Sequence, residues 1–353
     1  MTTGSNVVLS RIYVFDPRPR FPFQIVAKRY WIGDCPDGPG VSKTLEDDLT
    51  LVFMSGNGTP KEQWEVTIQR LFQHQQAAPR KTVQFHDMWS LEMPNQGDSA
   101  VLNEEVLRWG YDIFSWEVYA RGVHAFLAGL GTGVDVDFSK RKLALVGHSL
   151  GGAVALLVTT YYPLLKISSL HLFEPTLAGE SGQDHGYQIA EVVDKQTVVW
   201  NSSEDCLQQL GRRAWDKRIL KLFVEHGLRP LPTADHPDLK DGVTSKGTKK
   251  QLIAAFRDCV SKGVAYRYLP HVLKDIPTHI TYGTVADFIP GEWQEDTLHI
   301  ASGGISNFAS VTKVPGAGHM ILQTHPDVIG DVLWESVTQP HEWFTKNAVV
   351  AKL

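Results

Sequence analysis

One stretch constrains the fold of this chain more than any other: residues 142–160, which read KLALVGHSLGGAVALLVTT. An apolar run typical of a buried strand leads into the turn Gly-His-Ser-Leu-Gly, and a helix rich in small and apolar residues follows. The glycines two residues before and two residues after Ser149 let the strand and the helix approach each other closely. A strand, a sharp turn with Gly-x-Ser-x-Gly and a helix are typical of a nucleophile elbow. The sequence therefore predicts a reactive serine hydroxyl at Ser149.

The rest of the chain alternates between strand-like and helix-like segments, as a mostly parallel sheet requires. Strands are predicted at 7–15, 24–31, 49–54, 82–86, 143–146, 168–173, 279–282 and 309–314, and helices at 63–75, 112–127 and 331–343. Together with the elbow, this order predicts an α/β-hydrolase fold, in which helices flank an eight-stranded, mostly parallel sheet.

The alternation stops after the sixth predicted strand. Residues 208–226 and 249–262 have helical patterns, and the polar stretch 230–247 reads as a connector between them. We therefore expect a helical cap at 177–276, inserted into a hydrolase core made of 1–176 and 277–353. A second polar stretch, 93–99, has the composition of a surface loop.

Composition excludes several classes of protein. A net charge of -5 and a pI of about 6.3 argue against a nucleic-acid-binding protein. No stretch contains the roughly 18 consecutive apolar residues of a membrane span, and the first residues lack the pattern of a secretory signal. Three widely spaced cysteines indicate a reducing compartment rather than a disulfide framework or a metal site. We expect no metal ion or cofactor, and a homodimer is left open.

The last three residues, Ala351, Lys352 and Leu353, have the form of the peroxisomal targeting tripeptide, small–basic–leucine. They predict a peroxisomal location and binding to the peroxisomal import receptor. The alternative interpretation is an incidental sequence at the end of the chain.

A serine hydroxyl needs a base to take its proton, and the base needs a third group to orient it. His319 follows the last predicted strand in the Gly-rich turn 315–319. It is also preceded by both Ser149 and the candidate acids, which is the order that this fold uses. His148 lies inside the elbow, and we expect its side chain to point away from the site.

Two carboxylates are candidates for the orienting acid. Glu174 ends the sixth predicted strand, and Asp287 follows the seventh. Both strand ends lie beside the histidine loop in this architecture, so either side chain could accept the Nδ1 proton of His319. Spacing alone favours Asp287. We expect the other carboxylate to be either a buried polar anchor or a group that supports the catalytic residues without touching the substrate.

The oxyanion hole needs two backbone N–H groups that point at the tetrahedral oxygen. Leu150, directly after the predicted nucleophile, supplies one of them. The second is expected from the Gly-rich turn after the third predicted strand. We assign the second N–H group to Asn57 in this turn. We expect Gly56, directly before it, to contact the substrate.

Four motifs together resemble fungal peroxisomal α/β hydrolases: residues 51–58 with Trp64, 95–100, 147–152 and 172–175. This group includes a yeast peroxisomal lipase-like enzyme and acyl-CoA hydrolases of mycophenolic acid and host-selective toxin biosynthesis. The resemblance implies that the acid follows strand six, which is Glu174 here. The oxyanion loop of these relatives usually begins His-Gly, whereas this chain has Ser55-Gly56.

The implied chemistry is acyl transfer to water from an ester or thioester, with acyl-CoA as the expected substrate class. Arg213, Lys217 and Lys221 recur at helical spacing and could meet the phosphates of CoA, although a solvated basic face fits the same pattern. An acyltransferase or cyclase and a carbon–carbon hydrolase would use the same triad. A non-catalytic binding protein on the same scaffold is the alternative of a different class.

Overall fold

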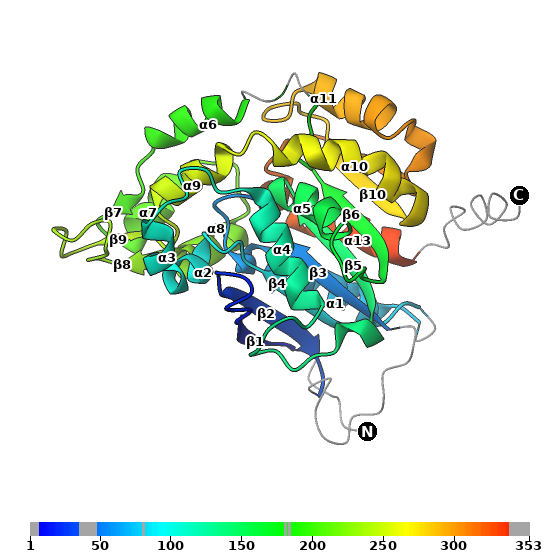
Figure 1. Ribbon diagram of the computed structural model, residues 1–353, viewed down its shortest axis with the longest axis horizontal. Coiled ribbons are helices and arrows are strands. Elements are labelled where there is room, and N and C mark those ends of the chain that lie inside the picture. The colour runs from blue at the N-terminus through cyan, green and yellow to red at the C-terminus, as the bar shows by residue number, and fades with distance from the viewer. Residues whose placement is uncertain (1–6, 35–47, 80–81, 180–181, 183–184, 339–353) are drawn as a thin grey trace, which may run out of the picture.

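The computed structural model describes residues 7–34, 48–79, 82–179, 182 and 185–338. At its centre lies an eight-stranded sheet in the order β1-β2-β4-β3-β5-β6-β10-β11 (Figure 1). These strands are β1 (Val8–Phe15), β2 (Ile25–Ile32), β3 (Leu49–Met54), β4 (Phe85–Leu91), β5 (Lys142–His148), β6 (Ile167–Phe173), β10 (Thr278–Gly283) and β11 (Ser310–Val314). Strand β2 runs antiparallel to its two neighbours and all other pairs are parallel, so the prediction of a mostly parallel sheet is confirmed.

Helices cover both faces of the sheet (Figure 1). On one face α1 packs against α13, and on the other α5 packs against α4 and α10. The bounds of these helices are α1 (Glu65–Ala77), α4 (Trp116–Leu127), α5 (Leu150–Val158), α10 (Ser261–Asp275) and α13 (Pro326–Thr338). Along β3 the side chains alternate between the two faces of the sheet. Met54 packs in the hydrophobic cluster beneath α5, and Phe53 packs in the cluster beneath α1. This alternation explains why β3 is apolar throughout.

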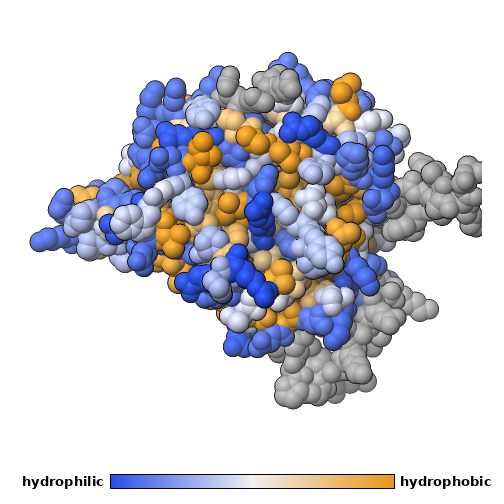
Figure 2. Space-filling view, viewed as in Figure 1, coloured by the Kyte–Doolittle hydropathy of each residue, from blue (hydrophilic) through white to orange (hydrophobic). Residues whose placement is uncertain are grey.

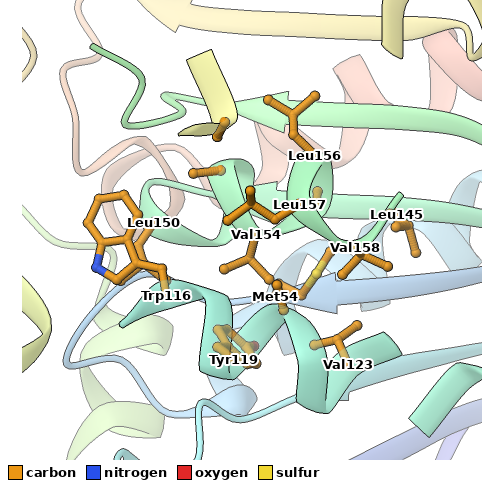
Figure 3. Packing of buried hydrophobic residues seen from close by; sticks show 14 of the residues in the cluster. Met54, Trp116, Tyr119, Val123, Leu145, Leu150, Val154, Leu156, Leu157 and Val158 are labelled. Atoms are coloured by element: carbon orange, nitrogen blue, oxygen red, sulfur yellow. The ribbon is translucent and has the colours of Figure 1, made fainter. Parts of the chain in front are cut away.

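Helix α5, which follows the elbow, is buried over its whole length. Figure 3 shows Val154 and Val158 beside Met54, with Tyr119 and Val123 of α4 on the adjoining side. A helix without a solvent-facing side needs no polar stripe, which accounts for its uniformly apolar sequence. The packing fixes the helix that follows Ser149 rigidly against the sheet.

Between β6 and β10 the chain forms an inserted segment, defined here as residues 177–276. Before α10 it contains α6 (His185–Asp194), β7 (Val199–Trp200), α7 (Ser203–Leu210), α8 (Lys217–Gly227), β8 (Leu228–Pro230), β9 (Val243–Ser245) and α9 (Lys249–Phe256). The three strands form a small antiparallel sheet in the order β7-β9-β8. The segment is therefore not purely helical, and the predicted connector at 230–247 contains β9. Figure 2 shows hydrophobic residues among hydrophilic ones on this face, several of them where α9 and α10 lie.

Helix α10 packs against α5 and contributes Leu269 and Leu273 to the main core. This helix therefore shares the core, although the boundary drawn at residue 276 assigned it to the cap. The remaining short elements are α2 (Gly97–Leu102), α3 (Glu104–Arg108), α11 (Gly291–Asp296), α12 (Ile321–Thr324), 3-10 turns at Lys61–Trp64, Phe138–Lys140 and Ile305–Asn307, and a π-helical turn at Thr297–Ala301.

The fourth predicted strand and the predicted surface loop differ from the structure. The fourth strand was expected at 82–86 but occupies Phe85–Leu91. Residues 93–99 were expected at the surface but are mostly buried beneath the inserted segment. There the Asn95 amide donates to the carbonyl of Gln251 at 3.0 Å, and the Gln96 amide donates to Oδ1 of Asn57 at 3.0 Å. These polar side chains therefore form hydrogen bonds within the protein, whereas their composition had suggested hydrogen bonds to solvent.

The described part of the chain contains no helix that is both long and apolar enough to cross a membrane. The predicted end of the last helix, 339–343, and the tripeptide Ala351, Lys352 and Leu353 lie outside the described residues.

Candidate active site

Ser149 occupies a sharp turn between β5 and α5. Its backbone has φ 58° and ψ -124°, a conformation that residues other than glycine rarely adopt. A Cβ on Gly147 would lie 2.2 Å from the carbonyl oxygen of Gly151, and one on Gly151 would lie 2.2 Å from that of Met54. Both positions therefore require glycine. The Ser149 amide donates to the carbonyl of Phe173 at 3.0 Å, which ties the turn to β6.

The serine and histidine predicted to act together lie side by side. Oγ of Ser149 is 2.9 Å from Nε2 of His319, and both residues are buried. The ring of Phe288 stacks on the His319 ring, with centroids 4.3 Å apart. Oγ1 of Thr176 lies 3.3 Å from the serine oxygen. This geometry lets His319 accept the serine proton.

The two candidate acids contact different parts of His319. Oε2 of Glu174 lies 3.5 Å from the ring atom Nδ1, and Oε1 of Glu174 accepts a hydrogen bond from the amide of Gly283 at 2.5 Å. Asp287 instead accepts hydrogen bonds from the backbone amides of His319 at 2.8 Å and Phe288 at 2.7 Å. The structure thus brings Glu174, and not the carboxylate favoured by spacing, to the histidine ring.

The second carboxylate was expected to be either a buried polar anchor or a group that supports the catalytic residues. Asp287 is exposed and holds the backbone of the histidine loop from the solvent side, which agrees with the second alternative. The 3.5 Å separation between Glu174 and His319 is longer than an ordinary hydrogen bond. Such contacts are often loose in unliganded enzymes and shorten when substrate binds.

His148 was expected to point away from the site, and this was wrong. Its Nε2–H donates to the backbone carbonyl of His319 at 2.8 Å, and the two rings lie 5.4 Å apart. Burial, and then the proximity of His319, lower the pKa of His148 to about 3. The side chain is therefore neutral at physiological pH and acts as a hydrogen-bond donor beneath the histidine loop.

Both residues proposed for the oxyanion hole line the wall beside Ser149. Leu150 is the first residue of α5, so its amide has no carbonyl partner in a preceding helical turn. The Asn57 side chain is anchored, because its Nδ2 donates to the carbonyl of Leu252 at 2.9 Å. Gly56 lies so close that an added Cβ would be 3.1 Å from Cβ of Ser149.

A small chamber surrounds the serine hydroxyl. Besides Ser149, its walls are formed by Asn57, Trp116, Leu150, Thr176, His185, Gly186, Ile189, Phe256, Lys262 and Phe288. Sequence reasoning did not find Thr176, His185, Lys262 or Phe288. Thr176 could have been found, because it follows the Glu-Pro motif at the end of β6. His185 and Lys262 belong to the inserted segment, where no sequence signal marks them.

A larger pocket of about 380 Å³ adjoins this chamber, and the two share four wall residues, Asn57, Ile189, Phe256 and Phe288. Most of its lining residues belong to the inserted segment, and many of these are apolar, such as Val192, Val198, Trp200, Leu210, Trp215, Phe223 and Leu252. An apolar group of considerable size therefore fits beside the serine.

The three basic residues expected on one helical face do not share a helix. Helix α7 ends at Leu210, and α8 begins only at Lys217, because the Asp216 side chain caps it by accepting a hydrogen bond from the Arg218 amide. Arg213 lies in the turn between the helices and lines the larger pocket. Lys221 lines a separate surface pocket, and Lys217 lines neither.

The sequence from residue 51 to residue 332 matches the family described as alpha/beta hydrolases. The chain belongs to the alpha/beta hydrolase family. The strand order and the strand–turn–helix around Ser149 agree with this assignment, and the predicted fold is confirmed. A search among curated proteins found no match.

Solved structures with the same fold include enzymes of several kinds. The peroxisomal alpha/beta hydrolase Lpx1 of Saccharomyces cerevisiae is 17% identical, with a TM-score of 0.67, and the match covers 98% of this chain and 95% of that one. A thioesterase domain from the curacin biosynthetic pathway is 13% identical, with a TM-score of 0.61 and coverages of 93% and 99%. An esterase of M. tuberculosis is 17% identical, with a TM-score of 0.58 and coverages of 92% and 91%. At these identities the likeness is one of fold.

Proposed function

We propose that this protein is a serine hydrolase that cleaves an acyl ester or thioester through an acyl-enzyme on Ser149. The observation that carries the proposal is the 2.9 Å contact between Oγ of Ser149 and Nε2 of His319 at a strained strand-to-helix turn. A serine in such a turn beside a histidine base is the arrangement of a nucleophilic hydrolase.

In the first half-reaction, Oγ of Ser149 attacks the carbonyl carbon while Nε2 of His319 takes the hydroxyl proton. Glu174 faces Nδ1 and stabilises the imidazolium that forms. The amides of Asn57 and Leu150 stabilise the negative oxygen of the tetrahedral intermediate. The bond to the alcohol or thiol then breaks, and His319 returns its proton to the leaving group.

In the second half-reaction, a water molecule attacks the acyl-enzyme with His319 again as the base. The carboxylic acid leaves, and the Ser149 hydroxyl is restored. The inserted segment acts as the cap that shapes the substrate pocket. Its apolar pocket of about 380 Å³ supports a substrate with a bulky apolar acyl group.

A thioester such as an acyl-CoA is the proposed substrate class. The resemblance to acyl-CoA hydrolases supports it, and one solved structure with the same fold is named a thioesterase. An acyltransferase or cyclase is the second candidate. The observation that favours it is the burial of Ser149, because a water-poor chamber would leave time for another acceptor to attack the acyl-enzyme. Adding an alcohol or amine acceptor and identifying the product distinguishes the two.

The test is a hydrolysis panel of acyl-CoAs and simple aryl esters with the wild-type protein, Ser149→Ala and Ser306→Ala. Ser306 is an exposed serine away from the chamber and serves as the matched control. We expect Ser149→Ala to lower kcat by about five to six decades and Ser306→Ala to leave it unchanged. Retention of wild-type activity in Ser149→Ala would refute the proposal.

A peroxisomal location is a separate proposal, which rests on the form of Ala351, Lys352 and Leu353. Removing these three residues from a fluorescent fusion should convert a punctate distribution into a diffuse one. An unchanged distribution would refute the targeting role.

A further inference from the structure

Of the described residues that line the pocket of about 380 Å³, a single one is charged. Among the described residues that line it, the walls are apolar side chains, glycines and neutral polar groups, and Arg213 alone carries a charge. Charged groups are depleted in such cavities unless they serve to orient a ligand. The position of this one cation therefore calls for an explanation.

Arg213 has no counter-ion within the described part of the chain. No carboxylate there lies within ion-pair distance of its guanidinium, which instead lies over the Trp215 ring at 5.7 Å from the centroid. Two other arginines of the inserted segment do have carboxylate partners. Arg218 pairs with Asp216 at 2.8 Å, and Arg229 pairs with Glu104 at 2.6 Å. Arg213 thus keeps its hydrogen-bond donors available at the exposed rim of the pocket.

The pocket connects this arginine to the reaction centre. Arg213 and Trp215 come from the turn between α7 and α8, and the same pocket is also lined by Asn57 and Phe288. These two residues also form walls of the chamber around Ser149. A substrate whose carbonyl lies at the serine can therefore extend into the pocket that Arg213 borders.

A guanidinium group binds planar anions such as carboxylates and phosphates with two parallel hydrogen bonds. With apolar walls on one side and an unpaired cation at the rim, the pocket suits a molecule with an apolar body and one anionic group. The structure does not gather Lys217 and Lys221 at this pocket, so the recognition depends on one arginine rather than on a basic cluster.

We propose that Arg213 selects substrates whose apolar acyl or leaving group carries one anionic group, a carboxylate or a phosphate, and that it binds this group directly. The inference rests on the proposed function, because that function places the scissile carbonyl at Ser149. It adds a specificity that the catalytic residues alone do not provide.

Two matched pairs of substrates test the inference. In the first, a thioester of a long dicarboxylic acid with its far carboxylate free is compared with the methyl ester of that carboxylate, both on the neutral thiol N-acetylcysteamine. In the second, one apolar acyl group is carried either by CoA or by N-acetylcysteamine. Each pair is assayed with the wild-type protein, Arg213→Met, Arg213→Lys and the control Arg212→Met, since Arg212 is exposed but does not line the pocket.

We expect Arg213→Met to lower kcat/KM by about 10- to 100-fold for the anionic member of one pair, mainly through KM. The neutral members should change by less than about threefold, Arg213→Lys should retain part of the preference, and Arg212→Met should behave as wild type. A loss in the first pair assigns the anion to the acyl group, and a loss in the second assigns it to the leaving group. Equal changes for neutral and anionic members in both pairs would overturn the inference.

A binding measurement separates this inference from the proposed function. Calorimetry with Ser149→Ala compares the long dicarboxylic acid with its dimethyl ester, which has no carboxylate left for Arg213 to bind, and it needs no turnover. Tighter binding of the acid that disappears in Ser149→Ala/Arg213→Met supports the role of Arg213 even where no thioester is hydrolysed. If a neutral thioester is cleaved in a Ser149-dependent way but Arg213→Met changes neither binding nor selectivity, the inference fails and the proposed function stands.

Discussion

At the residue scale, His319 is held by three side chains that contact different atoms. Glu174 faces the ring at Nδ1, Asp287 accepts from the backbone amide, and His148 donates to the backbone carbonyl. The two backbone contacts fix the loop, and the ring contact fixes the tautomer in which Nε2 can accept the proton of Ser149. The two carboxylates therefore have separable effects.

Exchanging each carboxylate for its amide tests this division. Glu174→Gln should lower kcat by about four decades, because an amide oxygen cannot stabilise the imidazolium. Asp287→Asn keeps an acceptor oxygen for the two backbone amides, so we expect a loss of no more than about tenfold. Single-turnover kinetics on one thioester gives both values. A larger loss for Asp287→Asn than for Glu174→Gln would contradict the assignment.

The buried neutral His148 predicts a distinct dependence of stability on pH. Its pKa is about 3 in the folded protein, against an ordinary value of 6.5, so unfolding takes up a proton between these pH values. The unprotonated His148 therefore makes the free energy of unfolding fall progressively as the pH falls from 6.5 towards 3.

Urea unfolding of the wild-type protein and His148→Gln at a series of pH values measures this effect. Glutamine keeps an N–H donor but does not titrate. Relative to the variant, the wild-type free energy of unfolding should fall by about 1.4 kcal/mol per pH unit between about pH 6 and 4. Parallel curves for the two proteins would contradict the burial of a neutral histidine.

At the element scale, a buried charge cluster joins the core to the inserted segment. The Lys61 ammonium is fully buried and lies 2.7 Å from Asp98 and 3.1 Å from both Glu62 and Glu92. Lys246, which follows β9, reaches the other oxygen of Asp98 at 2.5 Å. Burial raises the pKa of Glu92 to about 7 although Lys61 acts in the opposite direction. The lysine thus neutralises carboxylates that water cannot solvate.

Removing that lysine should be costly. We expect Lys61→Met to lower the free energy of unfolding by about 3–5 kcal/mol, because it removes the cation that faces the buried carboxylate of Glu92. Lys140 forms an exposed ion pair with Asp137, and Lys140→Met should change stability by less than about 0.5 kcal/mol. Denaturant titration provides both numbers. If Lys61→Met lowers the free energy of unfolding by less than about 1 kcal/mol, the charge cluster does not stabilise the contact between the core and the inserted segment.

The elements that sequence predicted well are those whose signal is local. Strand β3 is an apolar run bounded by polar residues, and it lies where the pattern indicated. Residues 93–99 were misread because their partners, Gln251 and Asn57, are distant in sequence. The helix expected at 208–226 is broken because Asp216 caps a new helix, and a capping residue inside a periodic pattern is easily overlooked.

At the scale of the whole molecule, some site residues are marked by the sequence around them, and others are placed by contacts between segments that are far apart in the chain. Ser149 and His319 were identifiable because glycine-rich turns mark both. Spacing favoured Asp287 although Glu174 faces the His319 ring, because β6 and β10 are neighbours and both strand ends meet the same loop. The residues that line the pocket beside Ser149 were not predictable, since the pocket forms only where the inserted segment meets the core.

The most direct test of the central claim, that Ser149 is an activated nucleophile, is intact mass spectrometry after reaction with a fluorophosphonate. The native protein should gain one adduct that maps to Ser149, and His319→Ala should react far more slowly because it lacks the base. Ser149→Ala should gain none. Absence of an adduct on the native protein, or equal labelling of Ser149→Ala, would contradict the claim.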